Sequence, residues 1–315
     1  FNHLLDMVRK ASEKAPKISP TYFETTFLVA MLSFSLSGVD RAIIETGMGG
    51  RLDATRMVNA DLCILTTVSM DHSEFLGPTL ADIAAEKVAI HRPGVPLIAL
   101  QQSDRGVIKA IEDAAGNDLM WWPVDISTPK KWDSYDSLVG AVAAYLNWDY
   151  SSSECIWPGR SPNFGKDWAE GVTTRLSAAH NAESLESDLS EVTIPTVVLF
   201  GMTRKADLKS TLSPLVTEIC MDRVFPKVIF TEPNSGRNPA VTVEELSEAM
   251  EQLGVGYVPT EAVKDPLKAF EIAGSMAREE NLELLVIGSV YLIGDLLQYV
   301  VERDGLDLWE VLTAH

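Results

Sequence analysis

The chain has 315 residues, of which 46% are hydrophobic and 23% charged, enough for two globular domains of ordinary size. Its formal net charge of −19 opposes nonspecific binding to nucleic acids and to anionic membranes. No apolar run approaches the roughly 20 residues of a membrane span. Cys63, Cys155 and Cys220 match no zinc or redox spacing, which predicts reduced thiols. We therefore expect a cytoplasmic protein, or a mitochondrial one if its natural N-terminus lies upstream of Phe1.

Helices and strands alternate along the first half of the chain. Thr21–Ser37 is apolar over most of its length and predicts a largely buried helix. Short runs rich in β-branched residues predict buried strands at Asp40–Thr46 and Leu62–Val68, followed by a helix at Thr79–Ile90. A further strand and helix are predicted at Pro96–Leu100 and Asp104–Ala115. This alternation predicts a parallel sheet covered by helices on both faces.

A second alternation follows a break in the pattern. The helical pattern of Ser134–Asn147 ends just before the run of serines at 151–153, and we place a domain boundary there. Strands are then predicted at Thr196–Gly201, Val228–Thr231 and Leu284–Gly288, with helices between them. The sequence therefore predicts two α/β domains, one at 1–150 and a smaller one at 151–315.

The stretch ETGMGGRLDATRM, residues 45–57, places three glycines where a predicted strand ends. It is not a Walker phosphate loop, because Gly50 is followed by Arg-Leu-Asp instead of Lys-Ser/Thr, and it is not a dinucleotide GxGxxG, because the third glycine is absent. The residues alone leave two interpretations open. The stretch is either a structural turn or a loop in which Glu45, Arg51 and Asp53 bind a metal or an anion.

A second polar cluster, SMDHSEFLG, follows the predicted strand at Leu62–Val68. Ligands of open α/β sheets bind beyond the carboxyl ends of the strands, so we expect Glu45 and His72 to lie at one edge of the sheet. A carboxylate and an imidazole can bind a divalent cation together with water and phosphate. Lys87, near the end of the predicted helix, is explained from its spacing alone as a solvated lysine near a helix C-terminus.

The residues 21–100 resemble the central domain of the dihydrofolate synthase/folylpolyglutamate synthase family, relatives of the Mur ligases. The motifs that carry this resemblance are PTYFE at 20–24, ETGMGGRLDAT at 45–55, MDHSEFLGPTLADIAAEK at 70–87 and RPGVP at 92–96. The second half is similar through shorter matches, WPGR at 157–160, AHNAES at 179–184, LFGMTRKAD at 200–207 and GSVYLIGD at 288–295. The resemblance implies a Mur-ligase-like parallel-sheet domain, truncated at its N-terminus, and a smaller Rossmann-like C-terminal domain.

The resemblance also implies an activity and a set of site residues. The family uses ATP and Mg²⁺ to form an acyl phosphate and joins L-glutamate to a pteroate or a folate. By resemblance, Glu45 and His72 bind Mg²⁺, and Lys87 is the catalytic lysine that is carbamylated beside it. The implied residues of the second domain are Arg160 and Asn181 for the nucleotide, His180 for catalysis, and Ser289 and Tyr291 for the glutamate side.

Three features depart from the family pattern. The GTNGKGS-type phosphate loop occurs nowhere in the 315 residues, and the family's DGAHN and DATN motifs read SAAHN, with Ser177, and DATR, with Arg56. The missing strand predicts unpaired backbone groups, so we expect a fragment, a polypeptide partner that supplies the strand, or a rewired sheet. Three functions compete: a ligase that is incomplete in this chain, a non-catalytic binding or scaffold protein, and an enzyme of altered, ATP-independent chemistry.

Overall fold

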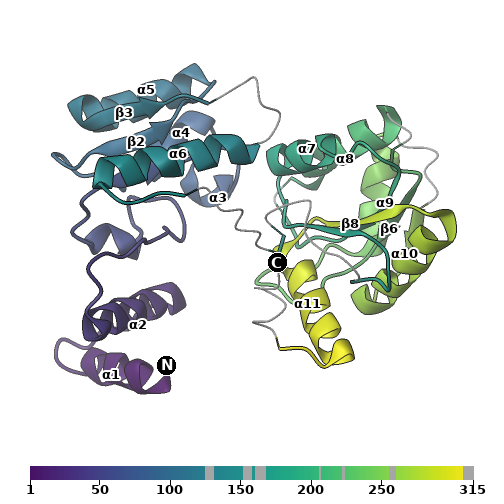
Figure 1. The fold of residues 1–315 in the computed structure, drawn as a ribbon, viewed down its shortest axis with the longest axis horizontal. Helices are drawn as coiled ribbons and strands as arrows, with labels where there is room; N and C mark the ends of the chain where they lie inside the picture. Colours follow the sequence, from purple (N-terminus) through teal and green to yellow (C-terminus); the bar gives the residue numbers. More distant parts are fainter. Residues whose placement is uncertain are drawn as a thin grey trace. The chain divides into compact units, whose positions relative to one another are not determined.

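The computed structural model describes residues 1–124, 131–151, 158–159, 168–205, 207–221, 224–254 and 260–307. The chain divides into two compact units, Phe1–Ser152 and Ser153–His315, and each is described by itself (Figure 1). None of the helices within the described ranges is both long and apolar enough to cross a membrane.

Unit 1 holds a three-stranded parallel sheet in the order β1-β2-β3. Its strands are β1 (Cys63–Leu65), β2 (Leu97–Leu100) and β3 (Leu119–Trp122), and its helices are α1 (Asn2–Ser12), α2 (Tyr22–Ser37), η1 (Ala54–Met57), α3 (Ser73–Leu76), α4 (Leu80–Val88), α5 (Arg105–Ala115), η2 (Gly116–Asp118) and α6 (Lys131–Leu146).

Both faces of this sheet are covered around its central strand, β2. Leu97 and Ala99 pack with buried side chains of α4 and α5, whereas Ile98 and Leu100 pack with Leu138 of α6. Successive residues of a strand point to opposite faces, so four consecutive apolar residues serve two cores. The predicted parallel sheet with helices on both faces is confirmed for this part of the chain.

Two predictions for the N-terminal part of unit 1 are wrong. The segment Asp40–Thr46 forms no strand, and Ile43 is 86% exposed. A strand needs a neighbour for its backbone groups, and among the described residues none pairs with this segment. The helix predicted at Thr21–Ser37 does form, as α2, with a Thr21–Glu24 capping box, but Val29 is its one buried residue. Its apolar composition predicted burial that the described residues do not supply.

Unit 2 holds a five-stranded, fully parallel sheet in the order β4-β8-β5-β6-β7. Its strands are β4 (Thr174–Ser177), β5 (Thr196–Phe200), β6 (Lys227–Phe230), β7 (Thr260–Ala262) and β8 (Glu283–Ile287), and its helices are α7 (Ala182–Ser190), α8 (Leu208–Met221), α9 (Val243–Gln252), α10 (Pro266–Glu280) and α11 (Val290–Asp304).

Each face of the unit 2 sheet has its own core. Helices α7, α8 and α9 pack on the face that carries Phe200 and Phe230, whose rings meet edge to face with centroids 6.2 Å apart. Helices α10 and α11 pack on the other face, which carries Leu199 and Val286. The three strands predicted in this half are confirmed, as β5, β6 and β8. Their apolar residues are buried, with successive residues on opposite faces of the sheet.

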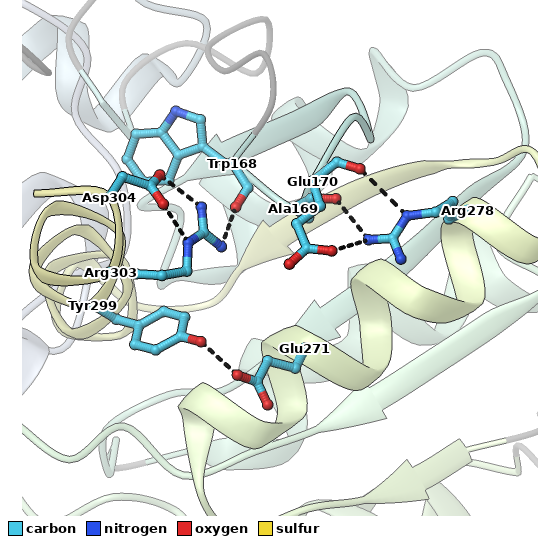
Figure 2. Close-up of polar contacts among 8 residues, drawn as sticks. All are labelled: Trp168, Ala169, Glu170, Glu271, Arg278, Tyr299, Arg303 and Asp304. Atoms are coloured by element: carbon cyan, nitrogen blue, oxygen red, sulfur yellow. Dashed lines mark hydrogen bonds and ion pairs between the residues drawn. The ribbon is translucent and has the colours of Figure 1, made fainter. Parts of the chain in front are cut away.

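Two arginines of α10 and α11 brace the chain where it approaches β4 (Figure 2). Arg303 donates to the backbone carbonyl of Trp168, at 3.2 Å, and pairs with Asp304. Arg278 donates to the carbonyls of Ala169 and Glu170, each at 3.3 Å, and to the Glu170 carboxylate. Glu170 has a positive φ of 50°, so these contacts hold a backbone conformation that non-glycine residues seldom adopt. The two arginines thereby hold the segment at 168–170 that leads into β4.

Candidate functional site

Asp53 organises the loop that follows Glu45. Its Oδ2 accepts hydrogen bonds from the backbone N–H groups of Gly47, at 2.9 Å, and Met48, at 3.1 Å. Its Oδ1 accepts from the backbone N–H of Thr55, at 2.9 Å, and from the Thr55 hydroxyl, at 2.6 Å. Four bonds to its own loop make Asp53 the N-cap of η1 and explain why the turn needs an acid there.

The glycines of the same loop allow a close approach to helices. A Cβ on Gly50 would lie 2.5 Å from the Lys87 carbonyl oxygen and 2.8 Å from the Ile90 nitrogen, and a Cβ on Gly47 would lie 2.5 Å from the Phe23 ring. Arg51 ties the loop to the same end of α4, because its backbone N–H donates to the Glu86 carbonyl and its guanidinium pairs with the Glu86 carboxylate at 2.7 Å. Packing on the end of α4 therefore explains Gly50, and packing on Phe23 of α2 explains Gly47, without any phosphate.

Arg56, which replaces the asparagine of the family pattern, also binds the end of α4. Its Nε donates to the carbonyl of Ala89, at 2.8 Å, and the nearby Arg92 donates to the carbonyl of Ile90, at 3.3 Å, and to that of Arg56 itself. The last carbonyls of a helix have no partner within the helix and carry partial negative charge, so cations stabilise them. This departure from the family motif thus has a structural explanation.

The three candidate residues of unit 1 lie on three different segments. Glu45 is exposed in the loop before Gly47, and Lys87 is half-buried in the last turn of α4. His72 precedes α3 with a left-handed φ of 53°, and its Nε2 lies 3.8 Å from Oδ2 of Asp71. A left-handed conformation at a residue other than glycine costs energy and is concentrated at functional sites. That strain distinguishes His72 from an ordinary helix-capping residue, since its side chain makes no cap bond.

The described part of the chain contains no group of three or more His, Cys, Asp or Glu residues arranged to hold a metal. No hydrogen bond or ion pair joins Glu45, His72 and Lys87 to one another among these residues. Neither Glu45 nor Lys87 makes a side-chain hydrogen bond or ion pair within the described residues. The donor chemistry fits a hard cation: one carboxylate and one imidazole remain available, and water and phosphate oxygens would complete the shell.

In unit 2, candidate residues gather at the carboxyl edge of the sheet. The turn after β4 carries His180 and Asn181, and Asn181 caps α7 by accepting from the Ser184 backbone N–H at 2.9 Å. The His180 backbone N–H donates to the Ser184 hydroxyl, and its ring Nδ1 lies 2.8 Å from the Ala178 carbonyl oxygen. Asn181 therefore has a structural role, and the His180 ring is held by its own turn.

The neighbouring strand β8 brings Ser289 and Tyr291 to the same edge, because Ser177 and Ile287 are paired at the last position of the register. Ser289 is buried and caps α11 by accepting from the Tyr291 backbone N–H at 3.1 Å. Two helix N-termini, those of α7 and α11, thus begin beyond the carboxyl ends of adjacent strands. Arg160, the remaining candidate, lies outside the described residues.

Sequence reasoning missed one residue of this edge, Asp188. Its Oδ2 accepts a hydrogen bond of 2.6 Å from the hydroxyl of Ser177, which is almost fully buried. In the sequence, Ser177 stands out only because it replaces the acid of the DGAHN motif. The one available signal was that loss, and nothing in the sequence shows that a carboxylate eleven residues later returns to the same place.

An open cavity of about 310 Å³ lies at the opposite, amino-terminal edge of the unit 2 sheet. It is lined by residues that include Thr173, Pro195, Arg278 and Glu283, and by none of the candidate residues. Ligands of open parallel sheets bind at the carboxyl ends of the strands, so we give more weight to the carboxyl edge than to this cavity.

No family model matches the chain. Its fold is similar to two solved structures of folate enzymes. The Escherichia coli protein FolC in complex with ADP aligns with a TM-score of 0.79 and 22% identity, over 96% of this chain and 76% of that one. The Mycobacterium tuberculosis folylpolyglutamate synthase complexed with ADP and AMPPCP aligns with a TM-score of 0.75 and 21% identity, over 94% and 76%. The chain therefore has the Mur-ligase-like α/β fold of these two structures.

Similar sequences agree with this likeness to folate enzymes. A probable dihydrofolate synthetase of Schizosaccharomyces pombe is 27% identical over 349 residues, covering 95% of this chain and 79% of that protein. The dihydrofolate synthase/folylpolyglutamate synthase of Escherichia coli is 44% identical over 81 residues, 26% of this chain and 19% of that protein. The chain is thus similar over most of its length to proteins named as dihydrofolate synthetases, which supports the resemblance that the sequence motifs predicted.

Proposed function

We propose that the protein takes part in ATP-dependent joining of L-glutamate to a pteroate or a folate through an acyl phosphate. One observation carries the proposal: 95% of the chain aligns with a protein named as a probable dihydrofolate synthetase. A solved structure supports it, since a bifunctional folylpolyglutamate synthase/dihydrofolate synthase of similar fold was solved with Mn, AMPPNP and L-glutamate bound.

In unit 1, the proposed metal ligands are Glu45 and His72, with Lys87 as the catalytic lysine. Glu45 would contribute a carboxylate and His72 an imidazole to Mg²⁺. When bound, the ion would neutralise the phosphate oxygens of ATP and make the phosphorus more electrophilic. Carbamylation of Lys87 would replace a cation beside the metal with an anion. Its lack of a salt-bridge partner among the described residues supports this role, because no existing ion pair has to be broken.

In unit 2, the proposed nucleotide contacts are Arg160 and Asn181, the proposed catalytic group is His180, and Ser289 and Tyr291 are proposed for the glutamate side. Asn181 and Ser289 already cap helices, so we propose that each acts on its ligand through the helix N-terminus that it holds, that of α7 for Asn181 and that of α11 for Ser289. Helix N-termini favour anionic groups such as phosphates and carboxylates.

A complete nucleotide site also needs a phosphate loop, and the 315 residues contain no Gly-Lys-Ser/Thr run. We propose that a polypeptide strand outside these residues supplies it and covers part of unit 1. The support is the exposed apolar side chains there: Ile43 is 86% exposed, and Leu36, in the predominantly apolar helix α2, is 65% exposed.

The test is a thermal melt of the chain with and without Mg-ATP, followed by an assay for ADP with pteroate, folate and glutamate. A ligand that binds only the folded state at a hundredfold excess over its Kd stabilises it by about 2.7 kcal/mol. We expect a clear rise in Tm that requires Mg²⁺. A cooperative melt without any shift would contradict nucleotide binding and favour the non-catalytic function.

Substitutions sharpen the metal assignment. Glu45→Ala and His72→Ala should abolish the Mg²⁺-dependent shift and leave the Tm of the free protein nearly unchanged, since neither side chain packs in a core. Glu74→Ala and His3→Ala, at other exposed positions of unit 1, are the matched controls and should keep the shift. An unchanged shift in the first pair would remove both residues from the metal site.

A further inference from the structure

A continuous chain of hydrogen bonds runs from Asp188 to His180. The Ser177 hydroxyl donates to Oδ2 of Asp188 at 2.6 Å and accepts from the backbone N–H of Ala179 at 3.1 Å. The His180 ring continues the chain through Nδ1, 2.8 Å from the carbonyl oxygen of Ala178. The two backbone groups in this chain, the N–H of Ala179 and the C=O of Ala178, belong to the same peptide unit.

This shared peptide unit couples the two ends of the hydrogen-bond chain, Asp188 and His180. A peptide group is planar, so a bond that fixes the direction of its N–H also fixes the direction of its C=O. Ser177 holds the N–H, and the ring of His180 is bonded to the C=O. The hydroxyl of Ser177 is itself oriented by Asp188, because a carboxylate can only accept and the hydroxyl proton must point to it. Successive bonds of this kind also polarise one another.

The same geometry decides the tautomer of His180. A backbone carbonyl oxygen has no proton to give, so the bond to Ala178 requires that Nδ1 carry the proton. In the neutral ring Nε2 then has none and can only accept. A ligand group that meets Nε2 must therefore be an N–H or O–H donor.

We propose that Asp188 is a positioning residue that acts through Ser177 to hold His180 as an Nε2 hydrogen-bond acceptor. The proposal concerns a site residue that the sequence did not reveal, and only its consequence for turnover rests on the proposed function. It also explains how the turn tolerates serine at the position where the family has an acid: the carboxylate is supplied from α7, at a position one helix away from the strand end.

The burial of the group explains why this carboxylate matters. Ser177 is 1% exposed, so water cannot replace Asp188 as the acceptor of its hydroxyl. Leaving a buried hydroxyl without a partner is costly, and the hydroxyl would turn to another acceptor. The Ala179 N–H would then lose its fixed partner, and the peptide that holds the His180 ring would be free to rotate.

The experiment measures the His180 tautomer directly, by ¹⁵N NMR of imidazole nitrogens in the full chain at about pH 8.5, where an ordinary histidine is neutral. His180→Gln assigns the signal. We expect the Nδ1–H form in the unmodified protein and a shift toward the Nε2–H form in Asp188→Ala and in Ser177→Ala. Ser190→Ala is the matched control, because its hydroxyl lies on the same helix and, within the described part of the chain, donates only to the Ser187 carbonyl. It should leave the tautomer unchanged.

A reciprocal exchange separates positioning from general damage to the fold. Ser177→Asp combined with Asp188→Ser keeps one hydroxyl and one carboxylate facing each other, and should restore both folding and the Nδ1–H form if the single variants lose either. An unchanged tautomer in folded Asp188→Ala and Ser177→Ala would overturn the proposal. So would a folded exchange variant that has lost the Nδ1–H form.

Turnover provides a separate readout. If the chain forms ADP with a folate substrate, Asp188→Ala should lower kcat/KM, because a His180 ring in the other tautomer cannot accept at Nε2. We expect a loss of about tenfold or more, as is typical when the outer partner of a metal-ligating histidine is removed. If the unmodified chain forms no ADP, the proposed function fails, but the NMR result still decides the role of Asp188. The two failures are therefore distinguishable.

Discussion

The two units share an alternating α/β pattern but differ in how far they bury their apolar residues. In unit 2, every residue of β5 is buried, and helices of the unit pack on both faces of its sheet. In unit 1, α2 is as apolar as a core helix, yet only Val29 is buried, and Leu36 is 65% exposed. An apolar pattern shows that a segment needs to bury one or more of its faces, but whether those faces are buried depends on the elements that pack against them.

The largest effect expected from this comparison is a difference between two leucine truncations. Leu285→Ala, in the middle of β8 and fully buried, should destabilise the protein by about 2–5 kcal/mol, because it leaves a cavity between two packed layers. Leu36→Ala, in α2, should change the unfolding free energy by less than about 0.5 kcal/mol, as exposed positions do. Urea unfolding followed by circular dichroism measures both. A large cost at Leu36 would show that α2 is covered in solution.

A second comparison applies one substitution to both units and expects opposite signs. Gly50→Ala in unit 1 should destabilise by about 1–3 kcal/mol, because its Cβ would lie 2.5 Å from the Lys87 carbonyl and the loop would have to move off α4. Gly294→Ala in unit 2 should stabilise by about 0.5–1 kcal/mol, since it lies within α11 and a Cβ would meet nothing within 4 Å.

The same urea titration decides this pair. If Gly50→Ala were neutral, the loop at 45–57 would not be pressed against α4 as the structure has it. Its glycines would then need another explanation, such as a ligand that approaches the backbone closely.

The elements that the sequence predicted well are those whose signals are local. Strands β5 and β8 are runs of apolar residues that end at glycine, and α4 begins with the Thr79–Asp82 capping box. The segment Asp40–Thr46 was predicted as a strand from the short apolar run around its two adjacent isoleucines, but it forms none. Strand formation depends on a partner, and composition carries no information about whether one is present.

The candidate site divides in the same way. The motifs named His180 and Ser289, and a strand was predicted before Ser289 but none before His180. The structure brings both residues to one edge of the unit 2 sheet. The contact between Ser177 and Asp188 was not predictable, because it depends on how α7 folds back on β4. The helix-capping roles of Asn181 and Ser289 were visible only once the helix boundaries were known.

The smallest effect concerns the reactivity of two cysteines, one in each unit. Cys63 lies in β1, where burial raises the pKa of its thiol and the nearby Arg92 guanidinium only partly offsets that rise. Cys220, in α8, is exposed. The thiolate is the reactive form, so iodoacetamide at neutral pH should modify Cys220 well before Cys63. A Cys155→Ser background keeps the third cysteine out of the measurement.

The pH dependence of this labelling gives the sign of the effect. Because the folded pKa of Cys63 is raised, its neutral thiol contributes stability below the ordinary thiol pKa, and this contribution is lost as the pH rises through the folded value. Labelling of Cys63 should therefore accelerate only at alkaline pH, as mass spectrometry of the modified peptides would show. Equal rates for both cysteines at neutral pH would mean that solvent reaches β1. The core of unit 1 would then be even less shielded from water than the exposure of α2 indicates.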